Sequence, residues 1–77
     1  MTIKVLLFGV LSETIKKESI SLDNIKDTDE LNNYLQNKYP ELKDYTYRIA
    51  VNHEIINGNI NLRDGDEVAL LPPFAGG

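Results

Sequence analysis

The chain has 77 residues, of which 42% are hydrophobic and 26% are charged, values typical of one small globular domain. Its net charge of −4 argues against nucleic acid or an anionic membrane as a partner and favours a basic protein surface. The absence of cysteine excludes a disulfide framework, a thiolate zinc site and a cysteine nucleophile. The apolar run 5–11 is too short to span a membrane, and no small-residue cleavage site follows it. We therefore expect one cytoplasmic domain held together by ordinary packing.

The N-terminal part of the sequence predicts two strands. Residues 2–8 are mostly apolar or β-branched, with Ile3, Val5 and Leu7 on one face and Leu6 and Phe8 on the other. Gly9 ends this strand, and residues 10–17 are compatible with either a turn of helix or an irregular loop. Residues 18–22 alternate polar and apolar side chains, which predicts a half-buried strand that pairs with the first.

A helix is predicted to begin after Asp27. This aspartate is a good N-cap, and Glu30 stands at the capping-box position three residues later. Pro40 ends the helix near Tyr39. Helical spacing gives the segment one apolar face, which consists of Leu31, Tyr34, Leu35 and Tyr39.

The remaining residues predict three strands joined by tight turns. Residues 45–51 alternate again, with Tyr47, Ile49 and Val51 on one side. A turn at residues 52–54 leads into the short strand 55–56, and residues 68–71 form the last strand. Two further turns are expected where a glycine follows Asn57 and where one follows Asp64.

These elements predict an α+β fold of the β-grasp (ubiquitin-like) type, with a mixed sheet of about four to five strands and one main helix across it. The first and last strands are the most continuously apolar, so we place them side by side and parallel at the centre of the sheet. We assign residues 1–71 to the domain and residues 72–77 to an extended C-terminal tail.

Most familiar catalytic patterns are missing from this sequence. His53 is the single histidine and has no neighbours at metal-ligand spacing, so it is expected in an exposed turn. Asp64 and Asp66 flank a turn glycine and are expected to form that turn. No serine lies in a nucleophile motif, and no glycine-rich loop opens a helix after a strand. We therefore expect neither a catalytic residue nor a metal site within the chain.

The C-terminal residues 72–77 are the strongest functional candidate. Pro72 and Pro73 cannot donate to a sheet ladder and favour an extended backbone, so they should project the tail away from the body. Gly76 and Gly77 have no side chains, so the terminal carboxylate can enter a channel too narrow for a Cβ atom. Six extended residues reach roughly 20 Å, far enough to enter another protein's active site.

The alternative is a frayed end that finishes in two glycines by chance, as about one chain in 200 does. The proline spacer and the predicted β-grasp body favour the functional interpretation.

The sequence resembles the small, sulfur-carrier subunits of molybdopterin synthase, the MoaD branch of the MoaD/ThiS family of ubiquitin-like proteins. The resemblance covers essentially the whole chain and is strongest over its last third. The motifs that carry it are residues 3–9, 50–52, 62–69, 71–73 and 76–77.

The resemblance implies that Gly77 is a covalent sulfur carrier in molybdenum cofactor biosynthesis. An ATP-dependent adenylating enzyme would activate its carboxylate, and a sulfur donor protein would supply the sulfur of a thiocarboxylate. The tail, consisting of Pro72, Pro73, Phe74, Ala75, Gly76 and Gly77, would then enter the large subunit and deliver sulfur to cyclic pyranopterin monophosphate. Two carriers and two large subunits would form a heterotetramer. Catalysis would reside in the large subunit, and the carrier itself would bind no cofactor.

The resemblance also implies a surface for docking. Phe8, Ile55 and Leu71 match an apolar contact patch of the family, and their alternative role is core packing. Full burial of Phe8 and Leu71 would exclude the patch. Phe74 and Ala75 stand where relatives often carry a smaller or polar pair, so a matching channel would have to be wider.

Other functions remain open at this point. Sulfur carriers for cysteine or thiamine synthesis have similar tails. A ubiquitin-like modifier would instead join Gly77 to lysines of target proteins, and a β-grasp interaction module would have an inert tail.

Overall fold

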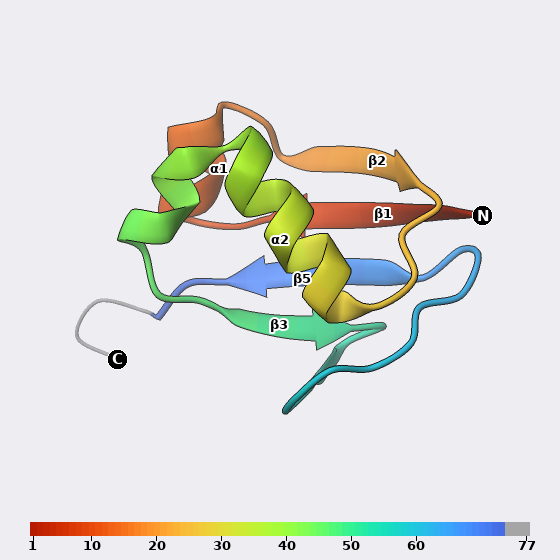
Figure 1. The fold of residues 1–77 in the computed structure, drawn as a ribbon. Helices are drawn as coiled ribbons and strands as arrows, with labels where there is room; N and C mark the ends of the chain where they lie inside the picture. The colour runs from red at the N-terminus through yellow and green to blue at the C-terminus, as the bar shows by residue number, and fades with distance from the viewer. Residues whose placement is uncertain (74–77) are drawn as a thin grey trace.

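A computed structural model describes residues 1–73 of the chain. Five strands and three helical segments follow one another in the chain: β1 (Thr2–Leu7), α1 (Val10–Ile15), β2 (Ser19–Asp23), α2 (Thr28–Lys38), the 3-10 helix η1 (Pro40–Asp44), β3 (Arg48–Val51), β4 (Glu54–Ile55) and β5 (Glu67–Leu71). The strands form one mixed sheet in the order β2-β1-β5-β3-β4, and α2 lies across one of its faces (Figure 1). The predicted β-grasp fold is confirmed.

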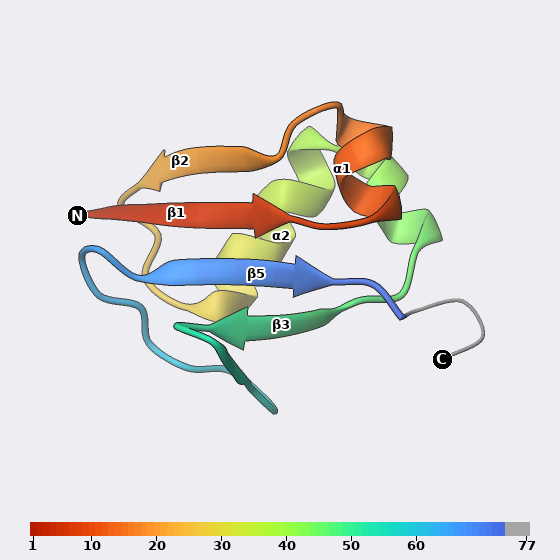
Figure 2. The same cartoon turned by 180° about the vertical axis from the view of Figure 1, so that it is seen from behind.

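The two central strands, β1 and β5, are parallel, as predicted. Val5 is the partner of Val68 and Leu7 is the partner of Leu70, while β2 and β3 flank the pair in antiparallel orientation. β1 and β5 therefore end at the same end of the sheet, opposite the N-terminus (Figure 2). The chain leaves β5 at this end, so the structure places the start of the tail beside the end of β1.

The core lies between the sheet and α2. The predicted alternation in β1 is confirmed, because Ile3, Val5 and Leu7 are buried. The predicted helix face is partly wrong: Leu31 and Leu35 are fully buried, but Tyr34 is 38% exposed. The buried face also includes Thr28, which lies one turn before Leu31 and is 2% exposed.

The cap predicted for α2 is present. The backbone N–H of Glu30 donates to Asp27 Oδ1 at 2.8 Å. This hydrogen bond is the main reason why the pKa of Asp27 lies below its usual value. Pro40 follows the helix and begins η1, so the predicted end of α2 is confirmed as well.

Residues 10–17, which the sequence left open, contain the short helix α1. It buries Leu11 and Ile15 and ends at Lys16, whose φ of 65° is left-handed. The helix begins after Gly9, where the chain turns out of β1.

The third strand is shorter than predicted. Residues 45–51 alternate, but the ladder with β5 begins only at Arg48, which pairs with Leu71. The residue after Leu71 is Pro72, which has no backbone N–H to extend the ladder. The following hairpin turn has two residues, Asn52 and His53, with φ values of 48° and 73°, so β4 begins at Glu54, one residue earlier than predicted.

Candidate functional site

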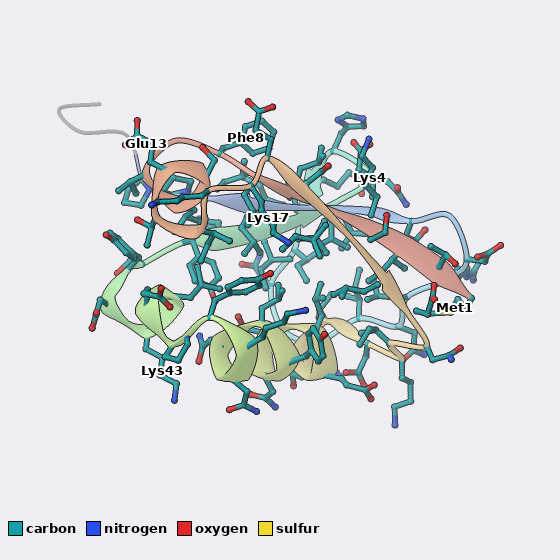
Figure 3. All side chains as sticks on the ribbon, turned by 90° about the horizontal axis from the view of Figure 1, so that it is seen from above. Met1, Lys4, Phe8, Glu13, Lys17 and Lys43 are labelled. Atoms are coloured by element: carbon teal, nitrogen blue, oxygen red, sulfur yellow. The ribbon has the colours of Figure 1, made fainter. Side chains whose placement is uncertain are left out.

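The face of the sheet opposite α2 carries the candidate site. Because side chains alternate along a strand, burial of Ile3, Val5 and Leu7 directs Leu6 to this open face. Figure 3 shows Phe8, just after β1, on the side of the sheet away from α2. In β5 the same alternation directs Glu67, Ala69 and Leu71 to the open face.

The structure brings the three predicted contact residues together. Phe8, Ile55 and Leu71 line one shallow hollow of about 290 Å³. Phe8 is 45% exposed and Ile55 is 52% exposed, and Leu71 is half-buried. Full burial of Phe8 and Leu71 would have excluded a contact patch, and neither residue is fully buried. Binding of a partner at this patch stays a prediction. We call the apolar part of this face, which consists of Leu6, Phe8, Ala50, Ile55, Ala69 and Leu71, the apolar surface.

Two alanines form the floor of the apolar surface. Ala69 pairs with Leu6 on one side and with Ala50 on the other, and Ala50 pairs with Ile55. Cross-strand partners lie on the same face of a sheet, so small side chains at the centre leave a depression between larger ones. Both alanines lie within the motifs that resemble the sulfur carriers, but their place at the floor of a hollow was not predicted. The sequence signal for such a depression is a small residue at an open-face position of a central strand, such as Ala69.

Polar side chains border the apolar surface at the end remote from the tail. His53 Nε2 lies 3.8 Å from Glu67 Oε1, and both side chains line the same hollow. The side chain of His53 is 87% exposed in its turn, as predicted. Asn52 fixes this turn, because its side chain accepts from the backbone N–H of Glu67 at 3.0 Å and donates to Asp66 Oδ1 at 2.9 Å.

The aspartates of the last turn have structural partners. Asp64 Oδ1 accepts from the backbone N–H of Thr2 at 2.7 Å, and Asp66 Oδ2 accepts from that of Arg63 at 2.8 Å. Both aspartates lie at the predicted turn. The side chain of Asp66 closes this turn, as predicted, whereas that of Asp64 ties the turn to the start of β1. Among residues 1–73, no three His, Cys, Asp or Glu side chains lie close enough to hold a metal ion.

The tail begins at the border of the apolar surface. Pro72 directly follows Leu71 and is half-buried, and Pro73 is exposed. A Cβ atom built on Gly9 would lie 3.4 Å from Pro72 Cγ, so the proline ring sits close over this glycine. The other predicted tail residues, Phe74, Ala75, Gly76 and Gly77, lie outside the described residues.

Comparison with known proteins identifies the family. The model of the ThiS family matches residues 5–77, nearly the whole chain. The chain belongs to the ThiS family.

Curated members of the family are similar over almost their full length. The molybdopterin synthase sulfur carrier subunit of Mycobacterium tuberculosis is 40% identical, with 97% of this chain and 96% of the relative covered. The protein of the same name from Dictyostelium discoideum is 35% identical, with coverages of 96% and 94%.

Solved structures agree with the fold. One is a complex of subunits 1 and 2 of the molybdopterin-converting factor from Helicobacter pylori, with a TM-score of 0.78, 36% identity and full coverage of both chains. Another is the small archaeal modifier protein 1 of Methanosarcina acetivorans, with a TM-score of 0.82 and 27% identity, covering 99% of this chain and 96% of that one. A putative molybdopterin converting factor subunit 1 from Pyrococcus furiosus gives a TM-score of 0.86 at 19% identity over 96% and 99% of the two chains, which supports the fold alone.

Proposed function

We propose that this ThiS-family chain is the sulfur carrier subunit of a molybdopterin synthase and that Gly77 carries the sulfur. The observation that carries the proposal is the 40% identity, over nearly full length, to a molybdopterin synthase sulfur carrier subunit. The solved complex of the two subunits of a molybdopterin-converting factor supports a large-subunit partner. The apolar surface beside the start of the tail is consistent with docking of such a partner.

The proposed chemistry takes place on the backbone terminus. A carboxylate oxygen of Gly77 attacks the α-phosphate of ATP in the adenylating enzyme, and pyrophosphate leaves. A persulfide of a donor protein then displaces AMP from the acyl-adenylate to give an acyl disulfide. A thiol attacks the donor's sulfur in this disulfide, which releases the thiocarboxylate and leaves a disulfide on the donor. The thiocarboxylate sulfur is finally bonded to cyclic pyranopterin monophosphate in the large subunit, and water cleaves the acyl–sulfur bond, so that the sulfur stays on the pterin and Gly77 regains its carboxylate. Acyl activation is needed because the charge and resonance of a free carboxylate oppose nucleophilic attack.

The carrier would contribute docking and delivery, and the partner enzymes would contribute catalysis. The described residues offer no nucleophile beside a base: Ser12 Oγ, for example, donates at 2.9 Å to the backbone oxygen of Gly9. Groups that stabilise the developing oxyanion would therefore come from the enzymes that close around the acyl carbon. In the proposed assembly two carriers and two large subunits form a heterotetramer.

The apolar surface fits this division of labour. Apolar side chains exposed next to the tail supply binding energy at a distance from the reacting atom, and such energy can hold a substrate in place.

None of the helices within residues 1–73 is long and apolar enough to cross a membrane.

Intact-mass measurement of the protein from its native host tests the proposal. We expect a species heavier by the difference between a sulfur and an oxygen atom, located at Gly77 by fragmentation. The matched control lacks Gly77 and should never acquire this mass. Absence of the heavier species, with the adenylating enzyme active and hydrolysis prevented, would refute the proposal. Copurification of the large subunit distinguishes molybdopterin synthesis from sulfur transfer to cysteine or thiamine.

A second candidate is a ubiquitin-like protein modifier, favoured by the similarity to the small archaeal modifier protein 1 of M. acetivorans. In that case Gly77 forms isopeptide bonds with lysines of other proteins. Blots against the chain would show a ladder of conjugates that disappears when Gly77 is deleted. A single band in cells that contain the thiocarboxylate would exclude this role.

A further inference from the structure

We infer that Gly9 is a positioning residue for the reactive tail, which it guides through its contact with the ring of Pro72. The inference deepens the proposed function and rests on it. It starts from a close approach between two segments far apart in the sequence: the Cβ that Gly9 lacks would lie 3.4 Å from Pro72 Cγ. This is a van der Waals distance, so the Pro72 ring lies directly against Gly9.

The conformation of Gly9 is fixed by the turn between β1 and α1. Its φ and ψ are 54° and −131°, a backbone conformation that side-chain-bearing L-residues rarely adopt. The backbone N–H of Leu11 donates to the carbonyl of Phe8 at 3.1 Å, and the hydroxyl of Ser12 donates to that of Gly9 at 2.9 Å. The turn is therefore held on both sides, and Gly9 presents a surface without a side chain to Pro72.

The sheet explains why these two residues meet. β1 and β5 are parallel neighbours whose last partners are Leu7 and Leu70. The segments that follow, up to Gly9 and up to Pro72, therefore leave the sheet side by side. Pro72 cannot donate a ladder hydrogen bond, so its ring packing is what constrains the chain there. Pro73 is already exposed, which makes Pro72 the last described residue partly covered by the body.

A displacement at this contact would change the direction in which the chain leaves the body. A side chain at Gly9 would strain the turn at φ 54°, and relief of that strain would move the backbone against which the Pro72 ring lies. Because the tail is attached at Pro72, a change of direction there would alter how Gly77 is presented to the adenylating enzyme. Misplacement of a reacting group by about 1 Å can lower a rate on the order of 100-fold, whereas docking through the apolar surface would be unchanged.

The test compares Gly9→Ala with Gly58→Ala. Both glycines have positive φ, 54° and 80°, but a Cβ on Gly58 would meet no atom within 4 Å. Both variants should therefore lose stability through backbone strain, and Gly9→Ala alone should displace Pro72. Three quantities are measured for each: the melting temperature, the Kd for the large subunit, and the rate of pyrophosphate release by the ATP-dependent adenylating enzyme at saturating carrier.

We expect both variants to bind the large subunit with a Kd within about two-fold of wild type. At saturating carrier, Gly9→Ala should release pyrophosphate at least about ten-fold more slowly than Gly58→Ala. Equal rates for the two glycine variants would overturn the inference while leaving the proposed function intact. If the adenylating enzyme does not activate even the wild-type chain, the proposed function fails, and the inference fails with it.

If Gly9→Ala does not fold, a second pair of variants tests the inference. Pro72→Ala removes the ring from the contact without straining Gly9, and Pro73→Ala makes the same chemical change one residue further along. Pro72→Ala should reduce the saturating rate more than Pro73→Ala does. In the free wild-type protein, a nuclear Overhauser effect between the Gly9 α-protons and the Pro72 ring should be observed. Its absence, or equal rates for the two proline variants, would overturn the inference.

Discussion

Replacing Phe8 by alanine removes the aromatic side chain of the apolar surface and tests whether this surface is where the large subunit docks. A phenylalanine side chain presents about 200 Å² of surface, and 45% of Phe8 is exposed, so a partner can cover about 90 Å². At about 25 cal/mol per Å², this area corresponds to about 2 kcal/mol, or about 30-fold in Kd. Ordering of side chains on binding reduces the net gain, so we expect Kd to rise by about ten- to 30-fold.

Titration calorimetry with the large subunit measures this change. Tyr34→Ala is the matched control, because Tyr34 is an aromatic residue with 38% exposure, but it lies on α2, across the sheet from the apolar surface. We expect the control to bind like wild type. The free energy of unfolding should change little in the Phe8 variant, by about 1 kcal/mol or less, since this side chain lies outside the core.

The refuting result is equally specific. If Phe8→Ala and Tyr34→Ala bind with the same Kd as wild type, the apolar surface does not dock the large subunit. The rate of sulfur transfer in the large subunit gives a second readout, since loss of docking area raises the carrier concentration needed for half-maximal rate. A Phe8 variant that loses rate at saturating carrier, with unchanged affinity, would contradict a purely docking role.

Three further predictions concern stability. Leu35→Ala empties a fully buried position and should cost about 3 kcal/mol in urea unfolding, where a loss below about 1 kcal/mol would contradict the assigned core. Thr28→Val removes a hydroxyl that donates to Asn59 Oδ1 and accepts from the backbone N–H of Ile60, both at 3.1 Å, so unfolding free energy should fall by about 1–3 kcal/mol. Asp27→Asn keeps a cap acceptor but does not titrate. The pKa of Asp27 is lowered in the folded state, so its stabilising contribution is present above the unfolded-state pKa and is lost as pH falls through the folded one. The variant should therefore lose less stability than wild type on acidification below about pH 4, and parallel acid curves would contradict the cap's electrostatic role.

Local patterns were sufficient to predict most of the fold. The alternation in residues 2–8 specified which side chains face the core, because successive side chains of a strand point to opposite faces of the sheet. Asp27 and Pro40 marked the ends of α2 through hydrogen bonding and steric restriction within a few residues. These signals act over short sequence distances, so they are visible without knowledge of the partners in space.

The errors arose where a distant segment decides the outcome. Adjacent residues on a helix point 100° apart, so Leu35 and Tyr34 face different directions, and contact with the sheet selected Leu35 for burial. The alternation in residues 45–51 predicted a longer strand, but the partner of β3 ends at Leu71 and is followed by Pro72. The first outcome depends on how α2 packs on the sheet, and the second depends on the register between β3 and β5.

The candidate site was likewise predicted only in part. The resemblance to the sulfur carriers supplied Phe8, Ile55 and Leu71, and the structure brings all three to one hollow. The alanines at its floor and the contact between Gly9 and Pro72 were not predicted, because both depend on the register between neighbouring strands and not only on which strands are neighbours. A glycine after a strand indicates a turn, but the sequence does not show what its missing side chain leaves room for.

The arrangement of β1 and β5 links docking to delivery. Both strands contribute to the apolar surface and both end where the tail begins, so the proposed docking site and the start of the tail adjoin. If a partner docks there, entry of the tail into the active site becomes an intramolecular step, and its effective concentration depends on how the start of the tail is held. A tail attached by a freely rotating joint would lose much of this advantage. In the proposed role, the contact between Gly9 and Pro72 is the means by which the body would influence the rate at which its terminus reacts.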